Sequence, residues 1–272
     1  MAMRIWHQSF TVLENLPAYA EGLAGHFKRV ARPDTEVVMH GMHPRTYLTD
    51  YPGGDIQYAY FQTLHSQQFI LGAINAEEGG FDAFALMTLP EPSLEDIRAI
   101  VDIPVTGYGE SAMTAAALVG QRIGVLLFIR EMAPTVERNV ARMGLTSRFV
   151  GAHDVGFRFN DVLAGYGQPE PLIERFKSAA RMMIARGADV IIPGEAPLCL
   201  LLARCGVTEV DGVPIVDAVA ATIKCAEMLV DLRRSTGLKC KTGYFSAKPP
   251  RERVRELLDF YGISRLEQKP KS

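Results

Sequence analysis

Short apolar runs alternate with amphipathic segments along most of this chain, and this alternation limits the folds open to it. Between the runs, helix-like stretches occupy residues 16–30, 57–78, 134–143 and 171–186. Short strands separated by helices form parallel sheets that carry helices on both faces. We therefore expect an α/β fold with mostly parallel sheets, ending in a loop and a closing helix at 251–260. The strand-like runs are residues 3–6, 35–40, 81–87, 103–107, 122–129, 148–153, 188–193 and 213–218.

A block that begins at Gly80 recurs at Gly187. In each block an Asp follows the glycine by two positions, a lone polar residue by eight and a proline by ten; the lone residues are Thr88 and Glu195. Each block then continues into a Pro-Val or Pro-Ile strand and a helix of small residues. Such a long-period repeat indicates an internal duplication. It predicts two halves of similar α/β design, related by approximate two-fold symmetry.

Thr88 and Glu195 each follow a predicted strand end. Ligands of open parallel sheets bind beyond the carboxyl ends of the strands, in the crevice between halves. We expect the two side chains to face each other across one pocket, with the pKa of Glu195 raised toward the range useful for proton transfer. The alternative is that Glu195 only caps the following helix, with Pro197 in its first turn.

Other strand ends supply further candidates for substrate contacts. The stretch "GYGES" precedes a helix expected at 112–119, so free backbone N–H groups there form a possible cradle for an anion; a plain turn is the alternative. His7, Gln8 and Ser9 follow the first strand and can enter the same crevice. Tyr47 lies in a long loop of the lid type, or in an ordinary surface loop. The candidates in the glycine-rich stretch are Gly107, Tyr108, Gly109 and Ser111.

The composition excludes several classes of partner. A formal charge of −2 with no basic block argues against nucleic acid, and no apolar run is long enough to span a membrane. Without a secretory leader, the four cysteines are expected to be reduced thiols of a cytoplasmic protein. Neither they nor His40 and His43 have the spacing of a metal site, so no metal is expected. Cys199 is expected to be a core thiol and Asp217 a helix cap, and the apolar helix at 218–232 suggests a homo-oligomer.

The two repeated blocks, "GFDAFALMTLPEPSLEDI" and "GADVIIPGEAPL", with "IPVTGYGESAM" and "VPIVDA", resemble the aspartate/glutamate/hydantoin racemase superfamily, and its hydantoin-racemase-like branch most. The similarity runs over residues 3–232. It implies two pseudo-symmetric, doubly wound α/β halves, formed by residues 1–114 plus 220–272 and by residues 115–219, and chemistry that needs neither cofactor nor metal. It also implies two cysteines that work as acid and base from opposite sides of the cleft.

The chain departs from that pattern at both cysteine positions, which are Thr88 and Glu195 here. A Thr hydroxyl is a poor base near neutrality, whereas Glu195 can still carry a proton. Thr88, together with Ser111 and the backbone around it, can stabilise an oxyanion. His7-Gln8-Ser9 replaces the family's Asn-Pro-Asn, so a substrate other than a free amino acid is plausible.

We therefore expect a cofactor-independent isomerase or lyase that uses Glu195 as its single acid/base on a small carboxylate or hydantoin-like substrate. Hydrolysis of a small cyclic amide with the help of Glu195 is one alternative. A small-molecule binding protein without catalytic activity is the other.

Overall fold

The computed structural model describes residues 2–48, 53–240 and 247–263. Its first sheet contains four parallel strands in the order β2 (Thr35–His40), β1 (Met3–Ser9), β3 (Ala83–Met87) and β4 (Val105–Gly107). The two inner strands, β1 and β3, are buried along nearly their whole length. This explains their continuous apolar sequences, since strands with helices on both faces have no solvent side.

The second sheet has the same strand order. β6 (Phe149–Asp154), β5 (Ile123–Leu127) and β7 (Val190–Pro193) run parallel, and a parallel bridge from Ile191 to Ile215 occupies the fourth position. The strand expected at 213–218 therefore joins this sheet only at Ile215. Within that segment, β9 (Val213–Pro214) pairs antiparallel with β8 (Glu209–Val210).

Helices cover both sheets, and their bounds are close to those expected for the long amphipathic segments. Around the first sheet lie η1 (Leu13–Asn15), α1 (Pro17–Val30), α2 (Gly53–Ile56), α3 (Ala59–Glu78), α4 (Leu94–Ile100) and α5 (Tyr108–Val119). Around the second lie η2 (Arg130–Met132), α6 (Ala133–Arg142), η3 (Thr146–Arg148), α7 (Phe159–Gly165), α8 (Glu170–Ala185) and α9 (Ala196–Arg204). The closing helix α11 (Arg251–Phe260) has the expected bounds and rests on α3 through ion pairs of Arg251 and Arg255.

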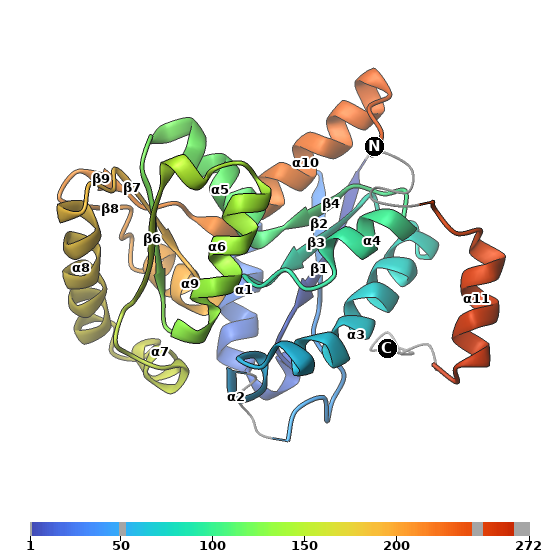
Figure 1. Cartoon of the computed structure of the whole chain (residues 1–272), viewed down its shortest axis with the longest axis horizontal. Helices are drawn as coiled ribbons and strands as arrows, with labels where there is room; N and C mark the ends of the chain where they lie inside the picture. The colour runs from blue at the N-terminus through green and yellow to red at the C-terminus, as the bar shows by residue number, and fades with distance from the viewer. Residues whose placement is uncertain (1, 49–52, 241–246, 264–272) are drawn as a thin grey trace.

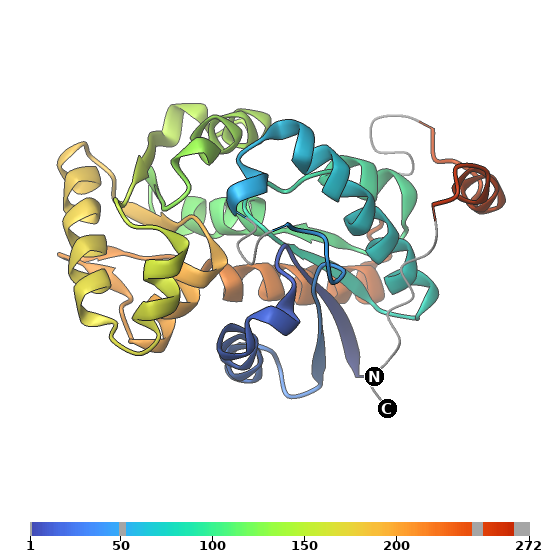
Figure 2. The same ribbon diagram turned by 90° about the horizontal axis from the view of Figure 1, so that it is seen from below.

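Helix α10 (Ala218–Thr236) returns the chain to the first sheet. It contacts β1, β3 and β4, and it lies along the long axis of the molecule (Figure 2). Its buried positions recur in pairs four residues apart, from Ala218 to Val230, as one helical face requires. It ends near the N-terminus, where Arg234 donates a hydrogen bond to the Ala2 carbonyl (Figure 1).

These observations confirm the predicted α/β class with two mostly parallel sheets. The two sheets lie side by side, with α5 and α10 at their junction (Figure 1). The residue boundaries of the two halves stay a prediction, because α5 contacts strands of both sheets. Within the described residues, none of the helices combines the length and apolar character that a membrane crossing requires.

Candidate active site

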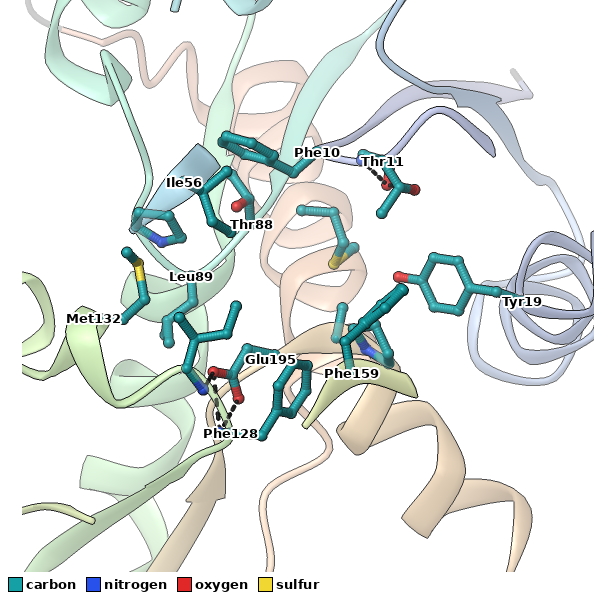
Figure 3. Close-up of a pocket in the computed structure, with 16 residues that line it drawn as sticks. Phe10, Thr11, Tyr19, Ile56, Thr88, Leu89, Phe128, Met132, Phe159 and Glu195 are labelled. Carbon is teal, nitrogen blue, oxygen red and sulfur yellow. Dashed lines mark hydrogen bonds between the residues drawn. The ribbon is translucent and has the colours of Figure 1, made fainter. Parts of the chain in front are cut away.

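A cavity of about 60 Å³ lies at the carboxyl ends of β3 and β7 (Figure 3). Thr88 and Glu195, which follow these two strands, both line it. Its other polar side chains are Ser9, Thr11 and Tyr19, and no lysine, arginine or histidine is among its described lining residues. The remaining wall is apolar and consists of Phe10, Ile56, Met87, Leu89, Pro90, Phe128, Ile129, Met132, Phe159, Ala196 and Pro197.

Glu195 occupies the N-cap position of α9, but its side chain makes no capping hydrogen bond to that helix. Its carboxylate instead crosses to the end of β5. There it accepts hydrogen bonds from the backbone N–H of Phe128, at 3.1 and 3.2 Å, and of Ile129, at 3.0 Å (Figure 3). The capping explanation of this carboxylate therefore does not describe its contacts.

Gly194 makes this crossing possible. A Cβ at this position would lie 2.3 Å from Cδ2 of Leu127 and 3.0 Å from the carbonyl oxygen of Leu126. Only glycine lets the end of β7 approach β5 so closely. The Gly-Glu pair at the strand end thus sets where the carboxylate can reach.

The environment of Glu195 raises its pKa to about 8. Burial is the main cause, because it disfavours the charged form, and the negative charge of Asp154 adds to it. The N–H groups of Ile129 and Phe128 act in the opposite direction. Near neutral pH both the acid and its conjugate base are therefore populated, as proton transfer in either direction requires.

Thr88 lies beyond the end of β3 with 5% of its surface exposed. Its carbonyl accepts the N–H of Glu91 at 3.2 Å, which closes a tight turn around Pro90. No described residue hydrogen-bonds to the Thr88 hydroxyl, which lies at the cavity together with Glu195 (Figure 3).

Of the three candidates at the end of β1, the structure brings only Ser9 to the cavity. The Ser9 hydroxyl lies 2.8 Å from that of Thr11. Gln8 instead holds the scaffold: it accepts from the Trp6 indole and donates to the Gly41 carbonyl. Both faces of β1 are buried, so strand alternation places these side chains in the core instead of the crevice.

His7 is fully buried against the ring of Phe27, and neither of its ring nitrogens has a hydrogen-bond partner among the described residues. Burial lowers its pKa to about 3, with a smaller contribution from His40. His7 is therefore a neutral core residue that does not line the cavity.

Tyr47 also lies outside the cavity lining. Its hydroxyl donates to the carbonyl of Phe10 at 2.5 Å, so it supports a wall residue from behind. Part of the loop expected to act as a lid, residues 49–52, lies outside the described residues.

The glycine-rich stretch differs from the expectation in two ways. Helix α5 begins at Tyr108, four residues earlier than expected, and its first turn already binds a carboxylate of the chain itself. Glu91 accepts the N–H of Glu110 at 2.7 Å and occupies the space beside Gly107 and Gly109. None of Gly107, Tyr108, Gly109 and Ser111 lines the cavity.

Several features of the site were missed from the sequence. Tyr19 lies on the apolar face of α1, and this pattern predicts an ordinary core residue. The N–H groups of Phe128 and Ile129 belong to the backbone, so the residue types in the sequence do not reveal them as donors. Glu91 carries a charge in a segment that resembles a solvent-exposed helix start.

The other candidates have structural roles. Asp217 caps α10 by accepting the N–H of Ala220 at 2.9 Å, as expected, and its second oxygen lies 2.9 Å from Nε2 of His26. Cys199 is 2% exposed, and burial raises its pKa to about 12, so it is a poor nucleophile. Within the described ranges, no cluster of three or more His, Cys, Asp or Glu side chains is arranged to hold a metal ion.

A comparison with family models and a comparison with known sequences both match this chain to racemases. A family model described as Asp/Glu/Hydantoin racemase matches residues 27–226. A hydantoin racemase from Pseudomonas sp. (strain NS671) is 27% identical over 232 residues, which are 85% of this chain and 88% of that protein.

Two solved structures share the fold. The allantoin racemase from Klebsiella pneumoniae superposes with a TM-score of 0.72 at 19% identity, over 92% of this chain and 95% of that one. The allantoin racemase from Pseudomonas fluorescens gives a TM-score of 0.67 at 23% identity, over 92% and 99% of the two chains.

Proposed function

The chain belongs to the Asp/Glu/hydantoin racemase family, and from this membership we propose that it is a cofactor-independent isomerase in which Glu195 is the single acid/base. The substrate we propose is a small, neutral, hydantoin-like ring. The observation that carries the proposal is the buried Glu195 carboxylate in an apolar cavity, held by two backbone N–H groups, with a pKa of about 8.

The proposed reaction begins at a ring carbon that lies next to a carbonyl group. The Glu195 carboxylate takes the proton from this carbon, and the C–H electron pair moves to form an enolate. The carbonyl oxygen gains the negative charge, which hydroxyl donors in the cavity stabilise. For isomerisation the planar enolate must present its opposite face to protonated Glu195, which returns a proton there; this restores the base and gives the other enantiomer, whereas return to the original face gives exchange alone.

The cavity favours a neutral ring over a free carboxylate. A buried carboxylate needs a cation or several donors to offset its lost hydration. No cationic side chain is among the described lining residues, and the N–H groups of Phe128 and Ile129 already bind Glu195. A substrate anion beside this carboxylate would also meet like-charge repulsion. The hydantoin racemase relative supports the same substrate class.

Exchange of the C5 proton of 5-benzylhydantoin in D₂O, followed by ¹H NMR, tests the proposal. We expect the wild-type chain to exchange this proton and Glu195→Gln to be slower by about 10²–10⁴-fold, the usual contribution of general acid–base catalysis. Alanine and aspartate, which carry free carboxylates, are expected to exchange far more slowly.

Glu227→Gln is the matched control. Glu227 is also a buried glutamate, but it binds the Arg32 N–H and Lys224 instead of lining the cavity. This variant is expected to keep the parental exchange rate. Equal rates for Glu195→Gln and wild type would reject the mechanism, and a ring-opened product would indicate a hydrolase instead.

A further inference from the structure

Tyr19 presents an unused hydrogen-bond donor to the cavity. It lies in the first turns of α1, and only 2% of its surface is exposed. Its ring forms part of the cavity wall, and its hydroxyl points inward (Figure 3). No described residue hydrogen-bonds to that hydroxyl.

The neighbouring tyrosines differ in this respect. The hydroxyls of Tyr47, Tyr108 and Tyr166 each donate to a backbone carbonyl, at 2.5, 3.1 and 3.2 Å. A hydroxyl that faces a cavity and has no partner within the protein remains available to hydrogen-bond a ligand there. Tyr19 is thus the tyrosine at this site, among the described residues, whose donor remains available.

Burial raises the pKa of Tyr19 well above its usual range, and the neighbouring Tyr166 and Cys199 add to this effect. The phenol therefore stays protonated at any working pH. It can donate a hydrogen bond but cannot serve as a base, which distinguishes its chemistry from that of Glu195.

We propose that Tyr19 is a further catalytic residue, whose hydroxyl donates a hydrogen bond to the substrate carbonyl that becomes the enolate oxygen. This inference rests on the proposed function. Glu195, Thr88 and Tyr19 approach the cavity from three different directions (Figure 3). As the C–H bond breaks and an O–H bond forms on Glu195, the electron pair moves onto the carbonyl oxygen, where the phenol's hydrogen bond strengthens. No proton leaves Tyr19 in this step.

Tyr19→Phe removes only the hydroxyl. We expect C5 proton exchange of 5-benzylhydantoin to slow by about 10–10³-fold, in line with loss of one oxyanion donor. The melting temperature should stay close to that of wild type, because the variant loses no internal hydrogen bond. Tyr166→Phe is the matched control: it loses its bond to the Pro197 carbonyl, so it should melt lower and keep its exchange rate.

A binding measurement separates this proposal from the proposed function. Urazole is a planar five-membered ring that readily loses a proton, and its anion resembles the enolate of a hydantoin. At pH 7 Glu195, whose pKa is about 8, is mostly protonated, so its charge does not repel the bound anion. By calorimetry at this pH, we expect wild type and Glu195→Gln to bind urazole, and Tyr19→Phe to bind it about tenfold or more weakly, because this variant lacks one donor to the anion.

The two failures are distinguishable. If Glu195→Gln exchanges at the parental rate but Tyr19→Phe binds urazole weakly, the mechanism fails and the Tyr19 site stands. If urazole binds wild type and Tyr19→Phe equally, or does not bind wild type, the Tyr19 proposal is overturned. An unchanged exchange rate in Tyr19→Phe, with Glu195→Gln inactive, overturns it as well.

Discussion

The Glu91 carboxylate accepts the backbone N–H of Glu110 at 2.7 Å and thereby caps α5 from a different segment of the chain. Its second oxygen lies 3.4 Å from Arg142 on α6. One buried side chain thus joins the loop after β3, the start of α5 and helix α6 beside the second sheet. Because Pro90 of the same loop lines the cavity, this contact fixes the wall that carries Thr88.

Replacing Glu91 by Ala should destabilise the fold by about 1–3 kcal/mol, because it leaves the Glu110 N–H buried without a partner. Chemical denaturation at pH 5, well below the raised pKa of about 7 that burial gives Glu91, measures this loss. The matched control is Glu95→Ala, which removes the other partner of Arg142, a more exposed carboxylate at 3.0 Å. That change should cost less than about 1 kcal/mol. Equal losses in the two variants would contradict the capping role.

The stability of the protein should fall as the pH rises from about 6.5 to about 8; below about 6.5, the buried His7 and His40, whose pKa values are lowered to about 3 and about 4, act in the opposite direction. The pKa of Glu195 is raised from 4.5 to about 8, so between these values the folded chain keeps a proton that the unfolded chain has released. Glu91, whose pKa burial raises to about 7, adds to the decline over the lower part of the range. In Glu195→Gln the slope of melting temperature against pH should be shallower, and above pH 8 this variant should melt higher than wild type.

The rate of proton exchange should depend on pH with the opposite sign. Glu195 must be ionised to take a proton, so kcat/KM for exchange should rise with pH and level off above about 8. Stopped aliquots analysed by NMR between pH 5.5 and 9.5 measure this profile. A rate that is flat across this range would show that another group removes the proton.

Thr88 should matter less than Glu195 but should control inversion. Thr88→Ala is expected to slow exchange by about 10–10³-fold if its hydroxyl stabilises the oxyanion. With a single base, exchange of the C5 proton should also be faster than inversion at C5. For one hydantoin enantiomer, the C5 proton signal should therefore disappear before the optical rotation does. Thr88→Cys places an acidic group opposite Glu195 and should reduce the difference between the rates of exchange and inversion. The control is Thr114→Ala, on the exposed side of α5, which should change neither rate.

The sequence predicted the parts of this site that depend on local order. Thr88 and Glu195 each follow a strand that can be recognised in the sequence by its apolar run and by the glycine before it. Parallel strands place such positions at the carboxyl-end edge of their sheet. His7 and Gln8 were misplaced because β1 is buried on both faces, so alternation cannot tell which side chains reach the crevice. Only Ser9, its last residue, lies far enough along the strand.

The start of α5 was misjudged for a different reason. Two glycines within four residues disfavour a helix, and nothing within the segment itself overcomes this. A carboxylate from nineteen residues earlier, Glu91, supplies the cap, and that distance in sequence hides it. Tyr19 escaped notice because a tyrosine on the apolar face of a helix has the same pattern whether its hydroxyl is satisfied or not.

The position of α10 constrains the order in which the molecule can assemble during synthesis. This helix contacts three strands of the first sheet, yet its residues leave the ribosome after the whole second half has been made. Until Ala218 and the residues that follow it emerge, β3 and β4 lack the cover that it supplies. Contacts between such distant segments slow folding and leave apolar surface open to association. The nascent first sheet therefore keeps this apolar face uncovered until the strands and helices of the second sheet have been made.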